Sequence, residues 1–224
     1  MPIRRIYARH LPHQIPPDTP IFITWNLKGA MPTSEIEAVR RERARLEARP
    51  PRTGEITADR RIRESKILFA AADRYLDRAV DGPANLGDPN AARIVDDFIR
   101  SGAGQHYGLF AWCVMSNHVH VLLKPNGELK DVMQRIKGST SFRINALQRE
   151  RGRILWQDES YDHWVRDEEE LFRIIGYIEN NPVAAGLCQH PADWPWSSAR
   201  LRSDWVAGEV YLVGKPGPNT GASG

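Results

Sequence analysis

The chain has 224 residues, of which 41% are hydrophobic and 26% charged, and its formal net charge is +3. These values are ordinary for a soluble globular protein of one domain, and the mild positive charge permits a polyanionic partner without requiring one. No apolar stretch reaches the roughly 18–20 residues needed to cross a bilayer, so we expect no membrane contact. Two cysteines exclude a disulfide framework. Because no secretory signal precedes the chain, we expect reduced thiols and a cytoplasmic location.

The first hundred residues predict one strand followed by three helices. Residues 1–20 contain five prolines and form an irregular lead-in. The next seven residues are β-branched and aromatic with an alternating pattern, which predicts a strand at 21–27. Ser34 and Glu37 have the spacing of a capping box at the start of the first helix, whose many Arg and Glu side chains predict a solvated helix. The helices are expected at residues 35–48, 59–80 and 90–101.

The second half of the chain predicts a β-hairpin and two helices. We expect strands at 107–115 and 118–124, joined by a tight Ser116-Asn117 turn. Apolar residues at helical spacing then predict a helix over 129–147 and another over 171–181, the latter ended by Pro182. The C-terminal tail, 201–224, is rich in Gly, Pro and Ser from Gly214 on, so we expect it to be partly disordered.

His118 and His120 stand two residues apart in an apolar strand. Successive side chains of a strand point to opposite faces, so both imidazoles share one face and Val119 lies on the other. Two neutral imidazoles on a rigid face can chelate a divalent ion. They are too few for a structural zinc site, but with an oxygen ligand they suit an exchangeable catalytic ion. The alternative is a pair of half-buried strand histidines that bind no metal.

Tyr177 lies at the edge of the apolar stripe of the last helix, and Asn181 follows one turn later on the same side. A phenol has a pKa near 10 and becomes a nucleophile only when a metal or base activates it. Its aryl oxide is also a good leaving group, so a phosphotyrosine suits a reaction that cuts DNA and later reseals it. The alternative is a boundary tyrosine with its hydroxyl at the surface.

Taken in order, these motifs resemble the IS200-like, single-tyrosine HUH transposases, and most closely the REP-associated tyrosine transposases. The resemblance covers most of residues 20–200. It is carried by a His-hydrophobic-His strand, by a Tyr-x-x-x-Asn helix and by shorter segments at 22–27, 136–140, 156–166 and 194–198.

The resemblance implies an α/β (α+β) fold, with a ferredoxin-like antiparallel sheet and helices on its faces. Residues 21–200 would form one HUH transposase-like domain. A charged helical insertion at about 30–105 is longer than in compact members. The family's metal ligands fall on His118 and His120, its nucleophile falls on Tyr177, and Asn181 can complete the metal shell. The cofactor would be Mg²⁺ or Mn²⁺.

The implied activity is cleavage and rejoining of single-stranded, hairpin-flanked DNA through a 5′-phosphotyrosine, by a monomer or a homodimer. His163 matches a family position and is expected near the site, where supporting a metal ligand or contacting DNA is as favoured as binding the ion directly. Tyr161 is the rival tyrosine, and because we expect it in a loop we assign it a structural role.

Several basic and aromatic side chains are candidates for DNA contacts. The candidate phosphate contacts are Lys130, Arg135, Lys137, Arg143 and Arg166, although each could equally be part of a solvated helix face. Three tryptophans, Trp25, Trp112 and Trp164, could stack on bases, but we expect at least two of them in the core.

Three other functions stay open on sequence alone. One is a domesticated, sequence-specific DNA-binding protein that no longer cuts. Another is a replication-initiating or relaxase-type nuclease, without a fused motor because no phosphate-binding Gly-rich motif is present. A third is a small-molecule metalloenzyme, which would show no salt-dependent DNA binding.

Overall fold

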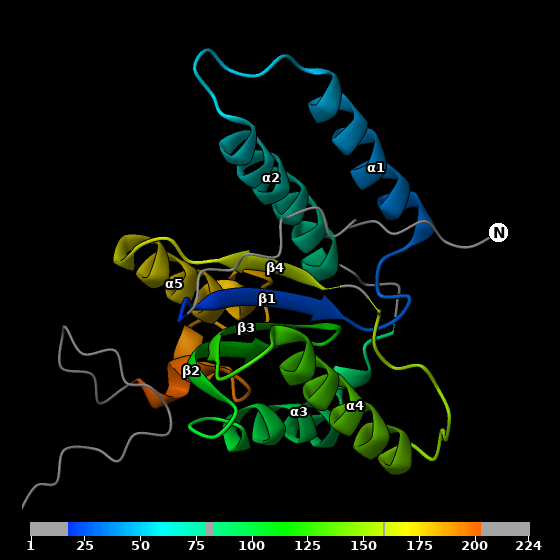
Figure 1. Ribbon diagram of the computed structural model, residues 1–224. Helices are drawn as coiled ribbons and strands as arrows, with labels where there is room; N and C mark the ends of the chain where they lie inside the picture. Colours follow the sequence, from blue (N-terminus) through cyan, green and yellow to red (C-terminus); the bar gives the residue numbers. More distant parts are fainter. Residues whose placement is uncertain (1–17, 79–82, 159, 203–224) are drawn as a thin grey trace, which may run out of the picture.

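The computed structural model describes residues 18–78, 83–158 and 160–202 (Figure 1). Most of the expected lead-in, the end of the second expected helix and nearly all of the expected tail lie outside these residues. None of the helices in these ranges is long and apolar enough to cross a membrane.

Four antiparallel strands form the sheet, in the order β2-β3-β1-β4. Helices connect β1 to β2 and β3 to β4, so the chain follows the β-α-β-β-α-β course of ferredoxin-like folds. The predicted fold class is therefore confirmed. The strands are β1 (Ile21–Asn26), β2 (Tyr107–Val114), β3 (His118–Pro125) and β4 (Tyr161–Trp164).

Five α-helices surround or extend this sheet within the described residues (Figure 1). The helices are α1 (Thr33–Ala48), α2 (Thr57–Arg78), α3 (Pro89–Ser101), α4 (Leu129–Leu147) and α5 (Glu168–Ala184). α3 and α4 contact each other and cover one face of the sheet, where their apolar side chains join those of β1 and β3. Ile175 and Ile178 of α5 cover the other face.

α1 and α2 pair with each other and project away from the sheet at the top of Figure 1. Their contact is a small apolar cluster that contains Val39 and Leu46 of α1 and Leu68 and Ala72 of α2. Val39 and Leu46 are also the buried residues of α1, which is otherwise exposed or half-buried, as its charged sequence predicts.

Three sequence-based expectations about these elements are wrong. The capping box is absent because α1 begins at Thr33, so Ser34 lies inside the helix, and no side chain caps its start. Pro182 does not end α5, which continues to Ala184. A proline in the last turn removes one hydrogen bond without displacing further turns, so Asn181 stays helical. Tyr161 begins β4 and is not in a loop.

Candidate active site

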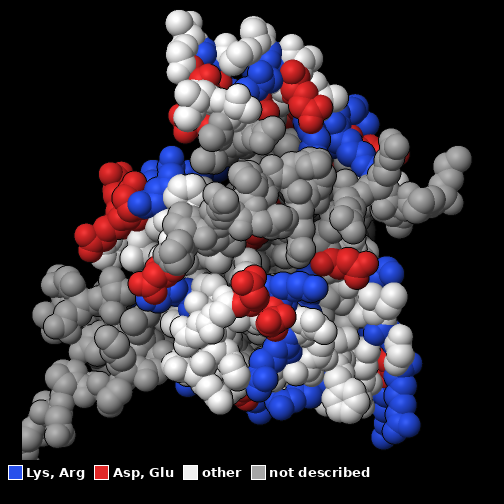
Figure 2. All heavy atoms as spheres, viewed as in Figure 1, with Lys and Arg blue, Asp and Glu red and all other residues white. Residues whose placement is uncertain are grey.

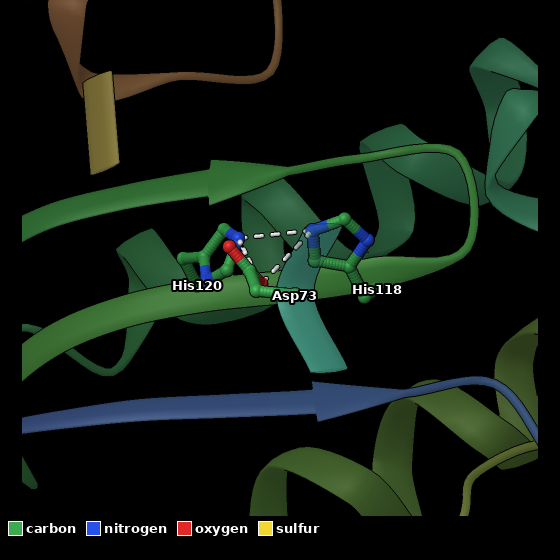
Figure 3. A group of neighbouring side chains, drawn as sticks. All are labelled: Asp73, His118 and His120. Carbon is green, nitrogen blue, oxygen red and sulfur yellow. Dashed lines mark hydrogen bonds and ion pairs between the residues drawn. The ribbon is translucent and has the colours of Figure 1, made fainter. Parts of the chain in front are cut away.

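His118 and His120 lie side by side on the face of β3 that α5 covers, and both side chains are fully buried. The alternation of the strand is as predicted, because Val119 and Val121 enter the opposite core. The two Nε2 atoms face each other at 2.9 Å (Figure 3). The strand therefore brings two ring nitrogens to a single point.

A chain of hydrogen bonds fixes the orientation of His118. The side-chain amide of Asn117 donates to the Leu76 carbonyl of α2 at 2.8 Å. Its oxygen therefore faces His118 Nδ1, at 2.6 Å. Because an amide oxygen can only accept, Nδ1 carries the proton and Nε2 keeps a free lone pair. This is the tautomer in which Nε2 can bind a metal.

His120 is held in a similar way by Thr24, its partner on β1, whose Oγ1 lies 2.7 Å from His120 Nδ1. Burial lowers the pKa of His118 to about 3. Burial, followed by the proximity of His118, brings the pKa of His120 well below its usual value. Both rings are therefore neutral at pH 7, which is the form that ligates metals.

Asp73 of α2 brings a carboxylate to the same point. Its Oδ1 lies 3.6 Å from His120 Nε2 and 4.0 Å from His118 Nε2 (Figure 3). Asp77, one turn later, lies 3.7 Å from His118 Nε2. Burial, and then the charge of Asp77, raises the pKa of Asp73 well above its usual range, against a hydrogen bond from Asn181. The pocket thus brings two carboxyl groups close to two neutral imidazoles, and Asp73 holds its proton more tightly than an ordinary aspartate does.

Tyr177 lies on α5 with its hydroxyl donating to Asp73. Its ring centroid is 5.8 Å from that of His120, and the rings of Phe22 and Phe69 lie at 5.9 and 6.2 Å. The side chain is still 38% exposed. A substrate from solvent can therefore reach a phenol whose ring is held by aromatic neighbours.

Asn181, one turn after Tyr177, is buried, and its amide hydrogen-bonds the Asp73 carboxylate. Within the described part of the chain, its Oδ1 has no hydrogen-bond partner, and neither has Oδ1 of Asp73. A buried polar atom without a partner is costly in a folded protein. Both oxygens belong to side chains next to the imidazole pair.

A divalent ion fits these residues. Asp73, His118 and His120 each offer a ligand atom, and the three atoms lie within 4.8 Å of one another. The two Nε2 atoms lie at hydrogen-bond distance, 2.9 Å, and a bound cation would take the place of the proton that they share. Mixed imidazole and oxygen donors suit Mn²⁺, and oxygen donors suit Mg²⁺.

His163 belongs to a different cluster. It lies on β4, and its Nε2 is 3.1 Å from Oε1 of Glu170. Glu170 also accepts hydrogen bonds from Lys66 of α2 at 2.7 Å and from Arg166 at 3.0 Å. Burial raises the pKa of Glu170, but the hydrogen bonds from Arg166 and Lys66 outweigh it and hold the pKa below its usual value. This cluster fastens α2 to α5.

The candidate DNA contacts have different surroundings. Lys130, Arg135 and Arg143 are exposed on α4, and Figure 2 shows basic side chains over this part of the molecule. Lys137 donates to the Gln157 carbonyl at 3.0 Å, and Arg166 is engaged with Glu170. An open hollow of about 500 Å³ on α4 is lined by Gln134, Arg135, Gly138, Ser139, Phe142 and Arg143.

The three tryptophans are mostly internal. Trp25 and Trp112 are buried in the core and Trp164 is half-buried, so at least two of them pack in the core, as expected. Tyr161 is also buried, and its ring stacks on Phe69 at 4.1 Å between centroids.

Comparison with known proteins finds transposases among the proteins that this chain resembles. Residues 94–181 match the family described as "Transposase IS200 like". The matched region contains both histidines of β3, Tyr177 and Asn181, whereas Asp73 and the whole of α2 lie before it.

A curated relative is also described as a transposase. A protein of Haemophilus influenzae described as a REP-associated tyrosine transposase is 31% identical over 121 residues. The match covers 48% of this chain and 66% of the relative, just under two thirds of its length.

Two solved structures are also similar. A REP-associated tyrosine transposase bound to a REP hairpin is 16% identical, with a TM-score of 0.46, and the match covers 97% of this chain and 94% of that one. A transposase from Deinococcus radiodurans is 16% identical, with a TM-score of 0.31, over 78% of this chain and 96% of that one.

Sequence analysis did not single out three residues of the site. Thr24 and Asn117 lie in segments that carry the family resemblance, but their roles depend on pairing between β1 and β3 and on contact with α2. Asp73 is harder to predict than Thr24 and Asn117, because it lies outside the segments that carry the resemblance. Its spacing of one turn from Asp77, which marks a polar face on α2, is the one pattern that points to it.

Proposed function

We propose that this protein is a metal-dependent tyrosine transposase that cuts and rejoins single-stranded DNA beside a hairpin, through a 5′-phosphotyrosine. The observation that carries the proposal is the convergence of Tyr177 and the two imidazoles on one carboxylate. The hydroxyl of Tyr177 donates to Asp73, and the Nε2 atoms of His118 and His120 lie within 4.0 Å of Asp73 Oδ1. The match of residues 94–181 to IS200-like transposases supports DNA as the substrate.

His118 and His120, with an oxygen of Asn181, are the residues we propose to hold the ion, Mg²⁺ or Mn²⁺. When bound, the ion would polarise the scissile phosphate and neutralise the charge that develops on it. The neutral state of both imidazoles and the partnerless Oδ1 of Asn181 favour this assignment.

Tyr177 is the proposed nucleophile. Its Oη forms a bond to the scissile phosphorus while the bond from phosphorus to the 3′ oxygen breaks. The phenol proton has an acceptor in place, because the hydroxyl already donates to Asp73. The departing 3′ oxygen takes a proton from solvent. The 3′-OH of another DNA end then attacks the phosphotyrosine, restores a phosphodiester and releases the tyrosine.

The exposed basic side chains of α4 are the proposed DNA-binding face. Lys130, Arg135 and Arg143 supply positive charge around an open hollow, and the ring of Phe142 is 77% exposed beside them. Cations that contact phosphates and an aromatic ring that stacks on a base are the usual elements of single-strand binding. We retain Lys137, Arg166 and His163 as secondary candidates for DNA contacts.

We propose that the protein acts in the cytoplasm, where the chromosome lies in bacteria.

A strand-cleavage assay tests the proposed function. Full-length protein is incubated with single-stranded hairpin oligonucleotides from the flanks of its own gene, labelled at either end, with Mn²⁺ or with a chelator. We expect a metal-dependent covalent adduct that retains the 3′ label, and a released 5′-labelled fragment that ends in a 3′-OH. Tyr177→Phe should abolish the adduct and leave DNA affinity within about twofold.

Tyr161→Phe is the matched control, because it removes a second phenol from the same aromatic cluster. It should still form the adduct. Binding without any adduct across all metals and oligonucleotides would overturn the proposed cleavage and favour a domesticated DNA-binding protein. An adduct that survives in Tyr177→Phe would show that another residue is the nucleophile.

A further inference from the structure

Three consecutive turns of α2 are fastened against the active site. Phe69 packs edge-on against Phe22, with centroids 5.4 Å apart, and stacks on Tyr161. One turn later comes Asp73, and one turn after that the Leu76 carbonyl accepts from Asn117. Contacts on both sides of Asp73 therefore fix its place opposite the imidazole pair.

The two oxygens of Asp73 have different surroundings. The hydroxyl of Tyr177 donates to Oδ2. Oδ1 faces the two Nε2 atoms and has no hydrogen-bond partner among the described residues, although the Asp73 side chain is only 4% exposed. A buried carboxylate oxygen that has no hydrogen-bond donor and faces two neutral imidazole rings is in an arrangement that a cation stabilises.

The separations agree with a shared ion. Neighbouring ligands of an octahedral Mg²⁺ or Mn²⁺ at about 2.1 Å lie about 3 Å apart. The two Nε2 atoms are 2.9 Å apart, and Asp73 Oδ1 is 3.6 and 4.0 Å from them. The carboxylate is thus already close to the positions that neighbouring ligands occupy.

We propose that Asp73 is a direct ligand of the divalent ion, so that α2 is part of the active site and one carboxylate links the ion to Tyr177. This inference rests on the proposed function, and it adds a ligand from a helix outside the family-matched residues. A carboxylate also supplies the negative charge that two imidazoles and an amide lack, which raises affinity for a hard cation.

Mn²⁺ binding to the full-length protein tests this ligand without DNA. The titration is followed by calorimetry or by the electron paramagnetic resonance of free Mn²⁺. Asp73→Asn should weaken binding at least about tenfold. Asp59→Asn is the matched control, with the same change on an exposed turn of the same helix, and it should stay within about threefold of the wild type. His120→Ala should lose binding.

A second variant tests directly whether the side chain at position 73 binds the metal ion. Asp73→Cys replaces a hard oxygen by a soft thiolate, so it should bind Cd²⁺ more tightly than the wild type does while it loses Mn²⁺ affinity. A residue with only a structural role would not reverse the metal preference. Melting temperatures without metal establish that the variants fold, and the rise in melting temperature on adding Mn²⁺ should shrink in Asp73→Asn.

The outcomes separate the two proposals. If Asp73→Asn binds Mn²⁺ like the wild type while His120→Ala does not, Asp73 is not a ligand and the proposed function stands. Equal losses in Asp73→Asn and Asp59→Asn would also overturn the assignment, because they would indicate a long-range electrostatic effect of the charges on α2. A wild-type protein that binds no Mn²⁺ would overturn both proposals.

Discussion

α5 and α2 reach the same cluster of side chains but are held there by different forces. α5 packs on the sheet through Ile175 and Ile178, which are buried in the apolar core. Of its described side chains, α2 adds only Phe69 and Leu76 to the apolar cores of the sheet. It is otherwise fastened by polar contacts, among them the Asn117 amide on its backbone and the ion pair of Lys66 with Glu170. Apolar packing is spread over many atoms, whereas each polar contact depends on one partner.

The site therefore has two halves: a robust half, formed by the sheet and α5, and a separable half, formed by α2. The sheet and α5 supply His118, His120 and Tyr177 from within the family-matched residues. α2, which precedes the match, supplies Asp73 and the acceptor that orients Asn117. Substitutions should therefore divide into those that abolish chemistry outright and those that detach or loosen α2.

The largest effect is expected from a substitution in the sheet, on β3. His118→Ala removes an imidazole that nothing else in the described site replaces. We expect Mn²⁺ binding to be lost and the rate of adduct formation to fall by about a thousandfold or more. Calorimetry and the cleavage assay measure the two quantities. Full activity in this variant would exclude a metal on β3.

A smaller effect on the same side should come from the neighbour of His120. Thr24→Val keeps the shape of the side chain but removes the hydroxyl 2.7 Å from His120 Nδ1. We expect Mn²⁺ affinity to fall about 10–100-fold, because the ring loses the hydrogen bond that holds its orientation. Thr24→Ser restores the hydroxyl and should restore affinity. Equal affinities for Val and Ser variants would contradict this role.

Glu170→Gln tests the attachment of α2. The side chain is buried and accepts from Lys66 and Arg166, so we expect a loss of about 1–3 kcal/mol in the free energy of unfolding at pH 7. Denaturant titration measures it. Glu169→Gln, an exposed neighbour, is the control and should change stability by less than about 0.5 kcal/mol.

The same variant has an expected pH dependence. The pKa of Glu170 in the folded protein lies below its usual value near 4.5, so its contribution is complete above that pH. It is lost as the pH falls through the lowered pKa, where the folded carboxylate takes up a proton. The difference between wild type and Glu170→Gln should therefore shrink in acid. A constant difference across pH would indicate that packing, and not charge, holds α2.

The smallest effect is expected on α4, which is neither of the two compared helices. A substitution there should change DNA binding without changing the metal site. Arg135→Ala should weaken binding of single-stranded DNA a few-fold and lower the slope of log affinity against log salt by about one. Arg45→Ala on α1 is the control and should leave the slope unchanged. Identical slopes for both variants would remove Arg135 from the DNA-binding face.

The sequence predicts the robust half well and the separable half poorly. Alternation in β3 is a local property, and it correctly sets His118 and His120 on one face. Helical spacing likewise gives α5 and the common side of Tyr177 and Asn181. Asp73 could not be assigned in this way, because its role depends on how a projecting helix returns to the sheet, and no local pattern specifies that contact.

The predicted start of α1 and the predicted end of α5 were wrong, and both errors have a physical reason. The Ser34 and Glu37 pattern is compatible with a capping box only if the helix starts at the residue after Ser34, and α1 starts earlier. Pro182 was expected to stop a helix, but the cost of a proline depends on how many turns follow it. These are questions of register, which sequence patterns define to within a few residues.

The Asn117 amide has a consequence for the order in which the molecule matures. Its orientation depends on the Leu76 carbonyl, which is synthesised first, while the imidazole it orients and the tyrosine of α5 emerge later. A ribosome-bound chain that ends before residue 177 has no nucleophile. A chain whose α2 has not docked lacks the acceptor that holds the amide. Competence for the proposed cleavage would thus be acquired at the last stage of folding, when both α2 and α5 have docked on the sheet.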